Sequence, residues 1–575
     1  MALAVGTLTV LAFLPALRCG FVHLDDPQTV PRYAAVMRGL TWDGVRLAFG
    51  DQFFGHYVPL TVLSLMLDWQ LWGRVAYGHH LTSVLLHGIN AALVFLLWRR
   101  ATCVGLGVAQ TWRAAAVALL VAVHPLRVEP VLWLTGRKDL LAGAGGLLAL
   151  WLYVRWREAP SRRRWLAVTL AFAAALLGKA TALVVPALML LLDFWPLERV
   201  FVRDRQDTAR DVARRVLALV VEKLPWLAMS AAAGVGALLS ARAGEAMAEL
   251  DVVPLSQRAA TAAVGSASYL RMTFWPTRLA AFYPLPAAGW SAAQVTAAAA
   301  LLVALTIAAI AAFRRFPWIT VGWLWWLACL LPVSGLLQAG EQAAADRYTY
   351  FASIGLTMAI VWTVAAWALR AHWRRVAAVS ALALALLAST AATRAQILTW
   401  RDSETVFRRM VAVTRGTHFG HLNLANVLAE SGRLPEAVRE YREAIRLRPD
   451  VALAWTGLGA ALRRQGDTAG ARAALERALQ QSPDLSAAHL QLAALYEEQG
   501  ALGPAAGHLA RVITLEPRHA QAWQGLASIL GRPGAAKQAL PFVTAIARSH
   551  PDSPDVARLL SVVRQRAAAE DRSAP

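Results

Sequence analysis

The sequence predicts an all-α chain in two parts, a polytopic membrane helix bundle followed by an α-solenoid of helical repeats. Composition gives the first indication, because 57% of the 575 residues are hydrophobic and only 16% are charged. A typical soluble domain carries about 25% charged residues. Apolar runs recur up to about residue 393 with charged clusters between them, which is typical of a multi-spanning protein. After residue 400 acids and bases alternate, and proline returns at a fixed interval.

The apolar runs predict about eleven membrane spans, since a helix of about 20 residues crosses the hydrocarbon core. The first span is expected to stay uncleaved, because it lacks the basic start and small-residue cleavage site of a signal peptide. The apolar stretch 258–278 contains three arginines, so we expect it to lie along the membrane surface. The spans lie near 3–17, 79–98, 112–123, 140–154, 165–178, 183–197, 216–240, 291–312, 318–337, 351–369 and 376–393.

Arginine clusters orient these spans, because basic loops stay on the cytoplasmic side. With residue 1 cytoplasmic, all the clusters share that side, and the loops around residues 25, 124–139 and 346 share the other. The net charge of +21 therefore reflects topology and does not indicate a nucleic-acid partner. Three separated cysteines predict neither a disulfide framework nor a zinc site. The clusters lie at 99–100, 155–164, 203–215, 314–315 and 370–375.

Rich arginine and alanine usage is typical of a GC-rich bacterium. We therefore expect a multi-pass inner-membrane protein whose N-terminus is cytoplasmic and whose outer loops and repeats are periplasmic. In a eukaryote the same side would be the lumen of the endoplasmic reticulum.

Proline at 449, 483, 517 and 551 marks four copies of a helix pair 34 residues long. Trp455, Leu458, Gly459 and Ala471 fall on the tetratricopeptide pattern in the best copy. We expect a membrane domain at 1–395, a linker helix at 396–417 and the repeats at 418–575, with copies near 418–451, 452–485, 486–519 and 520–553. Such a stack forms a groove for an extended peptide, with a spacer or a dimerisation arm as the alternative.

Four polar stretches share the outer side or its boundary, at 23–28, 124–139, 176–186 and 345–351. Charged residues at span ends are costly unless they are paired or functional, so the four together indicate a site. Lysine usage supports this, because only four of the 57 basic residues are lysine and two of them, Lys138 and Lys179, lie in these stretches. An ammonium that guanidinium cannot replace would explain their placement.

Adjacent carboxylates stand at Asp25 and Asp26 in the first outer loop. Neighbouring side chains point in different directions, and Pro27 biases Asp26 toward an extended backbone. We expect one carboxylate to face a substrate and the other to orient it or meet a cation, and the sequence leaves open which is the base. Repulsion between the two raises one pKa, which suits a general base.

Six segments occur in a characteristic order: FVHLDD, YVPLTVLSLMLDWQLWG (57–73), GHHLTSVLLH (78–87), HPLRVEPVLWLTGRKDLL (124–141), LLDFWPL (191–197) and DRYTYF (346–351). Together they resemble the multi-spanning GT-C type glycosyltransferases that end in tetratricopeptide repeats, the transmembrane-and-TPR O-mannosyltransferase family and its bacterial relatives. The resemblance covers essentially the whole chain. Members usually have asparagine shortly after the di-acidic pair, where this chain has Pro31, and at the HLxN position, where it has Ser83.

The resemblance implies transfer of mannose or another hexose from a polyprenyl-phosphate donor to serine or threonine hydroxyls of exported proteins, with inversion. A hydroxyl needs a positioned base, and a leaving lipid phosphate needs cations and hydrogen-bond donors. The expected catalytic residues are Asp25, Asp26 and Glu129. The expected donor-phosphate residues are His124, Arg137, Lys138, Lys179, Arg347 and Tyr348, supported by His80, Asp139 and Asp346.

The expected partners are the lipid-linked sugar, membrane lipid and an acceptor protein or peptide in the repeat groove. No metal motif is present, no cofactor is expected besides the donor lipid, and a divalent cation is left open. A membrane-anchored repeat scaffold without catalysis and a transporter of lipid-linked glycan are the alternatives. Acids and bases retained on one face favour the enzyme, and a transporter would more often show charges near the midplane and repeated halves.

Overall fold

The computed structural model describes residues 1–30, 33–50, 53, 55–201, 208–243, 253–286, 289–336, 342–414 and 416–572. They form two compact units, Met1–Thr414 and Arg415–Pro575. Nearly all regular structure is helical, which confirms the all-α class. The segment expected as a linker helix divides between the units, because α18 (Ser403–Val413) lies in the first of them.

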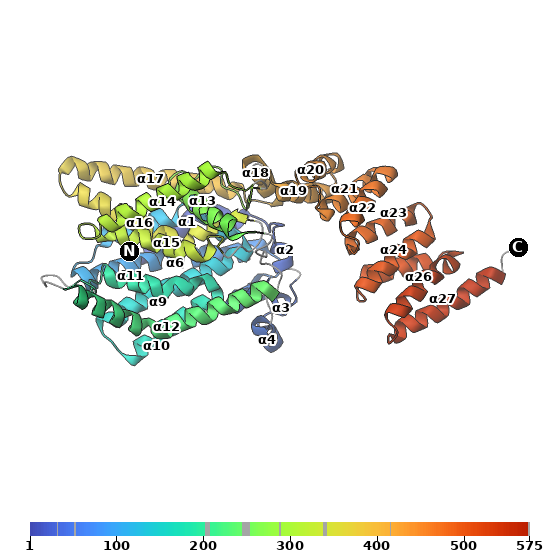
Figure 1. The fold of residues 1–575 in the computed structure, drawn as a ribbon, viewed down its shortest axis with the longest axis horizontal. Coiled ribbons are helices and arrows are strands. Elements are labelled where there is room, and N and C mark those ends of the chain that lie inside the picture. Colours follow the sequence, from blue (N-terminus) through green and yellow to red (C-terminus); the bar gives the residue numbers. More distant parts are fainter. Residues whose placement is uncertain are drawn as a thin grey trace. The chain divides into compact units, whose positions relative to one another are not determined.

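Long helices of the first unit run in roughly one direction, and the short helices α2, α3 and α4 gather at one end of the bundle (Figure 1). The helices before the middle of this unit are α1 (Ala2–Phe13), α2 (Asp26–Thr29), α3 (Ala34–Met37), α4 (Trp42–Gly50), α5 (Pro59–Trp72), α6 (Ala76–Leu106), α7 (Thr111–Ala122), α8 (Val128–Leu132), α9 (Arg137–Glu158) and α10 (Arg162–Gly178). The later ones are α11 (Val185–Phe194), α12 (Ala209–Ala243), α13 (Leu255–Phe274), α14 (Ala292–Ala311), α15 (Pro317–Leu330), α16 (Thr349–Ala368), α17 (His372–Leu398) and α18. A short antiparallel pair joins β1 (Tyr283–Pro284) to β2 (Gln342–Ala344), with Tyr283 opposite Ala344.

Each predicted span falls largely on a helix of this unit. Within the described ranges, five helices are long and apolar enough to cross a membrane, or six if the bent pair Thr111–Ala122 and Pro125–Leu132 counts as one span. Helices α14 and α17 are apolar yet mostly exposed, as expected of helices that face lipid. That the chain crosses the membrane about eleven times stays a prediction.

Helix α5 was not predicted, although its sequence had been singled out. It begins at Pro59, whose fixed φ suits the first helical position, and it ends at Gly73 with φ 54°. With 14 residues it is shorter than a spanning helix. It packs against α3, α4 and α6 and buries Val62, Leu65 and Asp68.

Tryptophan rings fill the centre of the first unit. The ring of Trp98 lies 5.8 Å from that of Trp325, 6.0 Å from Trp362 and 6.1 Å from Trp195, in tilted contacts. Helices α15 and α16 meet at Gly322 and Gly355, where a methyl group on either residue would collide with the other backbone. Small residues at such a crossing let membrane helices approach closely.

Two prolines interrupt the helix between α7 and α9 and so create the turn that carries the segment 124–139. Pro125 starts a 3₁₀ turn and Pro130 lies within the single turn of α8, and the pair of helices bends by 62° here. The break places Glu129 on α8 and Lys138 on the first turn of α9. Glu129 and Lys138 therefore lie in or next to the short helical turns between α7 and α9.

The second unit stacks helix pairs that coincide with the four predicted repeats. They are α19 (His418–Glu430) with α20 (Leu434–Leu447), α21 (Ala452–Gln465) with α22 (Thr468–Gln481), α23 (Ser486–Glu498) with α24 (Leu502–Leu515), α25 (Ala520–Leu530) with α26 (Ala535–Ser549), followed by α27 (Pro554–Arg572). One hydrogen bond recurs: Trp455 donates to the Pro449 carbonyl (2.9 Å) and Trp523 to that of Pro517 (2.8 Å). His489 replaces tryptophan at this position and donates to the Pro483 carbonyl at 2.9 Å.

Candidate active site

Asp26 joins its own loop to the segment 124–139. Its fully buried carboxylate accepts hydrogen bonds from the backbone N–H of Val22 (3.0 Å) and of Leu134 (3.2 Å). The hydroxyls of Thr29 and Thr135 meet beside it at 2.9 Å. Burial raises the pKa of Asp26 to about 7, against the opposing effect of these backbone donors. Both oxygens are thus occupied by the protein's own backbone.

Asp25, in contrast to Asp26, has a carboxylate that the protein does not enclose. It is only half-buried, and its carboxylate accepts no hydrogen bond from any described residue. Burial raises its pKa, while the positive charges of Lys138 and Arg347 lower it, which places all three groups in one neighbourhood. The carboxylate that remains available for a ligand is therefore Asp25.

Lys138 is the cation without a counter-ion in this part of the structure. Its side chain is only 6% exposed, yet it forms no ion pair or hydrogen bond with any of the described residues. Its ammonium lies 5.9 Å from the centre of the Trp133 ring. A buried, unpaired ammonium is costly, so this position favours an anionic ligand.

Arg347 and Glu129 form a buried ion pair between the turn at 346–348 and α8. The Glu129 carboxylate accepts a hydrogen bond from the Arg347 backbone N–H at 2.8 Å and pairs with the guanidinium. The guanidinium also donates to the side-chain oxygen of Gln342 at 3.3 Å. Glu129 thus holds a basic residue in place and has no carboxylate oxygen left over for a substrate.

Lys179 and Asp139 form a second ion pair in this cluster. Lys179 directly follows α10, and Asp139 lies on the first turn of α9. Their Nζ and Oδ1 atoms lie 2.6 Å apart, and the second oxygen of Asp139 is buried without a partner in the described structure. The ammonium of Lys179 lies 5.6 Å from the centre of the Tyr348 ring, whose hydroxyl accepts a hydrogen bond from Gln342 at 2.7 Å.

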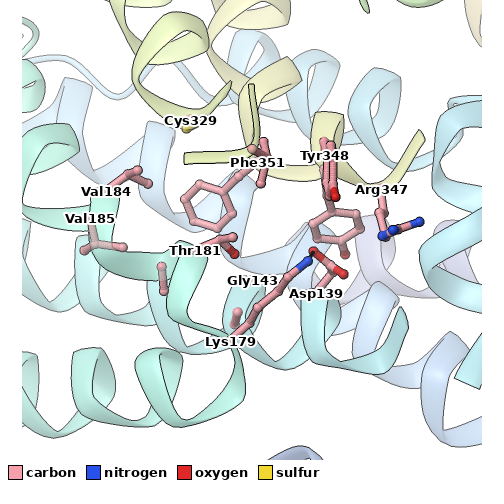
Figure 2. Close-up of a pocket in the computed structure, with 14 residues that line it drawn as sticks. Asp139, Gly143, Lys179, Thr181, Val184, Val185, Cys329, Arg347, Tyr348 and Phe351 are labelled. Carbon is pink, nitrogen blue, oxygen red and sulfur yellow. Dashed lines mark hydrogen bonds and ion pairs between the residues drawn. The ribbon is translucent and has the colours of Figure 1, made fainter. Parts of the chain in front are cut away.

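Four of these groups, Asp139, Lys179, Arg347 and Tyr348, line one end of a pocket of about 500 Å³, a volume that includes open solvent. Figure 2 shows Asp139, Lys179, Arg347 and Tyr348 at this charged end. The other end is apolar and is formed by Val184, Val185, Cys329 and Phe351. A pocket with this division fits an amphiphile that has an anionic headgroup.

Arg137 does not join the cluster. Its fully buried guanidinium pairs with Asp68 of α5 and donates to the His79 carbonyl (2.6 Å) and the Ser83 hydroxyl (3.3 Å). Thr82 holds the other oxygen of Asp68 at 2.7 Å. Arg137 therefore ties α9 to α5 and α6, and Ser83, where relatives usually have asparagine, is one of its acceptors. Pro31, the other departure, lies outside the described residues.

Three further expected residues bond to the scaffold. His124 donates to the Thr273 carbonyl at 3.0 Å through Nε2 and accepts the Leu126 N–H through Nδ1, so both ring nitrogens are used. His80 contacts the Gly20 carbonyl at 3.3 Å. Asp346 accepts a hydrogen bond from the Tyr283 hydroxyl at 2.8 Å.

Sequence reasoning missed two polar residues here. Asp68 lies in an apolar run, and an acid in such a run was a usable signal for a buried partner. His56 gave no comparable signal. The charge of Lys138 lowers the pKa of His56 to about 3, so a neutral imidazole lies near the cationic cluster. Within the described residues no group of three His, Cys, Asp or Glu side chains is arranged to hold a metal ion.

Comparison with family models matches tetratricopeptide repeats at residues 422–486 and 462–529. A crystal structure of a thermophilic TPR protein from Thermus thermophilus is 20% identical and covers 28% of this chain and 89% of that chain, with a TM-score of 0.22.

Three similar proteins are each named a protein O-mannosyl-transferase. Protein O-mannosyl-transferase Tmtc2 of Drosophila melanogaster is 35% identical over 194 residues, 31% of this chain and 20% of that protein. Protein O-mannosyl-transferase TMTC1 of Homo sapiens is 26% identical over 521 residues, 80% of this chain and 56% of that protein. Tmtc3 of Drosophila melanogaster is 25% identical and covers 70% of this chain and 49% of that protein. The chain thus spans between a fifth and just over half of these relatives. On these matches the chain is a homologue of proteins named protein O-mannosyl-transferases, with tetratricopeptide repeats in its C-terminal part.

Proposed function

We propose that this protein transfers mannose from a polyprenyl-phosphate donor to hydroxyl groups of exported proteins. The observation that carries the proposal is the pocket: two cations, Lys179 and Arg347, line one end, and the other end is apolar. Lys138 and the available carboxylate of Asp25 lie in the neighbourhood of Arg347. The names of the homologous proteins support the mannosyl transfer. The charged and apolar ends of the pocket support an amphiphilic phosphate donor. A carboxylate that can act as a base supports a hydroxyl acceptor.

The donor's phosphate is placed at the charged end, among Lys138, Lys179, Arg347 and the Tyr348 ring. Its isoprenyl chain lies along the apolar wall that includes Val184 and Phe351. Preorganised cations stabilise charge that develops on the leaving phosphate, and they act strongly because the site is largely shielded from water. Asp139 and Glu129 fix two of these cations and leave Lys138 to the ligand.

Asp25 is the proposed base. The acceptor hydroxyl gives its proton to the Asp25 carboxylate while its oxygen forms the bond to the anomeric carbon. The bond from that carbon to the phosphate oxygen breaks, and its electron pair stays on the lipid phosphate. One displacement inverts the anomeric centre. Asp26 positions the loop that carries Asp25 and takes no proton in this scheme.

The repeats are proposed to recruit the acceptor polypeptide in their groove, on the same, outer side of the membrane as the pocket. In a bacterium this side is the periplasm. Asn423 and Asn426 of the first repeat are already used within their own unit, by the Phe419 carbonyl (2.9 Å) and the Tyr441 hydroxyl (2.7 Å). Recognition by a repeating series of asparagines is therefore not part of the proposal.

The proposal is tested by mass spectrometry of exported glycoproteins from cells that carry the parent chain, Asp25→Asn or Asp43→Asn. Asp43 is an exposed aspartate on α4 of the same loop and serves as the matched control. Hexose on exported proteins should disappear with Asp25→Asn and persist with Asp43→Asn, at equal amounts of membrane-inserted protein. Unchanged glycans with Asp25→Asn would contradict the assignment and favour a scaffold or a transporter.

A further inference from the structure

Cations and aromatic rings alternate in a row beside the pocket. Lys138 Nζ lies 5.9 Å from the ring centre of Trp133, and the Arg347 guanidinium carbon lies 4.8 Å from the same centre. That guanidinium carbon is also 5.0 Å from the centre of Tyr348, which Lys179 Nζ approaches to 5.6 Å. Trp133 is the member of this row to which no role has yet been assigned.

The row brings three like charges together, and the rings moderate their repulsion. The electron-rich face of an aromatic ring attracts a cation. Glu129 and Asp139 neutralise Arg347 and Lys179, whereas Lys138 has no counter-ion among the described residues. The ring of Trp133 thus holds the surplus cation beside a paired one, which prepares the place for an anion.

Trp133 also offers a hydrogen bond that the described protein does not use. Its side chain is 9% exposed, and its buried indole N–H has no partner in the described structure. Indole N–H is a donor only, so its ligand must supply an acceptor. Four other tryptophans also bury an N–H without a described partner, but no two cations among the described residues contact any of their rings: Trp72, Trp98, Trp326 and Trp362.

The backbone of Trp133 is fixed at the centre of the site. Its N–H donates to the Glu129 carbonyl at 3.0 Å, and its carbonyl accepts from Gly136 at 2.9 Å. The next residue, Leu134, donates to Asp26. These hydrogen bonds connect Trp133 to Glu129, the partner of Arg347, and through Leu134 to the loop that carries the two aspartates.

We propose that Trp133 is a binding residue of the donor site, whose ring holds Lys138 and Arg347 close together and whose indole N–H donates to an oxygen of the donor's phosphate. The inference rests on the proposed function, because it takes the ligand to be a lipid phosphate. Phosphate oxygens are strong acceptors, and a hydrogen bond to a charged group is about twice as strong as a neutral one.

The test measures binding of a short polyprenyl monophosphate, with the matching polyprenol as the phosphate-free probe, to the full chain in lipid nanodiscs by calorimetry. Trp133→Phe keeps the ring and removes the N–H, and we expect its affinity for the phosphate to fall about tenfold. Trp133→Leu also removes the ring and should lose roughly a further threefold or more. Binding of the polyprenol should be unchanged in both variants.

Two other variants separate the outcomes. Trp98→Phe makes the same change at a fully buried tryptophan among other tryptophan rings and should bind the phosphate like the parent. Lys138→Gln reports on the proposed donor site itself and should bind the phosphate at least about tenfold more weakly. Parent-like affinity of both Trp133 variants, with Lys138→Gln impaired, would overturn the role of Trp133 and leave the donor site standing. Parent-like affinity of Lys138→Gln would overturn the donor site, and an equal loss in Trp98→Phe and Trp133→Phe would reduce Trp133 to a packing residue.

Discussion

Asp25 and Asp26 are neighbours in the chain, but their surroundings differ in kind. Asp26 is enclosed, with both carboxylate oxygens bonded to backbone N–H groups, whereas Asp25 is half-buried and lies close enough to Lys138 and Arg347 for their charges to lower its pKa. A peptide backbone turns successive side chains in different directions, so a pair of identical residues meets two environments. The sequence predicted that the two would differ, and it left open which one would be available for chemistry.

Asp26→Asn should destabilise the folded protein, and Asp25→Asn should not. An amide at 26 replaces one acceptor by a donor that faces a backbone N–H, at a cost of about 1–3 kcal/mol. Thermal unfolding in nanodiscs should show a lower midpoint for Asp26→Asn and a parent-like midpoint for Asp25→Asn. A fall of equal size in both variants would mean that Asp25 is as structural as Asp26.

Catalytic rate should depend on pH through Asp25, because a general base works only when it is deprotonated. Burial raises its pKa above the ordinary value of about 3.9, so activity should be lost on acidification at a higher pH than for an exposed aspartate. The charge of Lys138 opposes this shift, and Lys138→Gln should therefore move the acid limb of the kcat/KM profile to still higher pH. An acid limb that stays in place in Lys138→Gln would contradict the proximity of the two groups.

At the scale of secondary-structure elements, a few hydrogen bonds and ion pairs between distant segments position the residues of the site. The break between α7 and α9 carries Glu129, Trp133 and Lys138, and α5 supplies the acid that balances Arg137. In the repeats, one ring N–H in each of three copies bonds the carbonyl of the proline six residues earlier. Element stability can therefore be tested at single side chains.

Asp68→Asn should destabilise the first unit strongly. It leaves the fully buried Arg137 without a counter-ion, and removing one partner of a buried pair costs about 3–5 kcal/mol. The measurement is the thermal midpoint of the full chain in nanodiscs, with the exposed Asp43→Asn as control. A parent-like midpoint would show that Ser83 and the His79 carbonyl suffice for Arg137.

His489→Ala should weaken the third repeat, and His489→Trp should preserve it. Alanine loses the donor to the Pro483 carbonyl and leaves that acceptor to the solvent, with a loss of about 1 kcal/mol or more. Tryptophan restores the donor that the second and fourth repeats use. Limited proteolysis of the full chain should cut the repeats faster in His489→Ala, and equal rates in both variants would count against the recurring bond.

At the scale of the whole molecule, the main question is which side of the membrane each loop occupies. The polar site brings together segments near residues 25, 129, 138, 179 and 347, so these segments lie at one end of the helical unit. The arginine clusters predict that this end is the outer one. The orientation therefore rests on the charge pattern of the loops.

Single-cysteine labelling tests the orientation. Cys19 and Cys329 are buried, so a chain with Cys103 replaced offers a background of low reactivity. In intact cells a membrane-impermeant maleimide should label Asp43→Cys, on α4 near the site, and should label Ser161→Cys, between α9 and α10, only after permeabilisation. Labelling of both from the same side would contradict the predicted topology.

Much of this molecule is determined by local patterns that the sequence displays directly. Apolar runs of helical length define the bundle, and the 34-residue proline period defines the repeats, because both depend on contacts close in the chain. Helix α5 was not predicted, because its 14 residues include four polar side chains and so do not form an apolar run. The polar stretches of the outer side could likewise be named in advance.

The pairings within the site were decided by tertiary structure alone. Arg347 meets Glu129 across 218 residues of sequence, and Arg137 takes Asp68 rather than a ligand as its counter-ion. Among the described residues, Lys138 has no counter-ion and the indole N–H of Trp133 has no acceptor. Sequence determines which charged groups reach this end of the bundle. Only the directions of side chains in irregular turns decide which of them neutralise one another, because that depends on distances of a few ångströms between segments far apart in the chain.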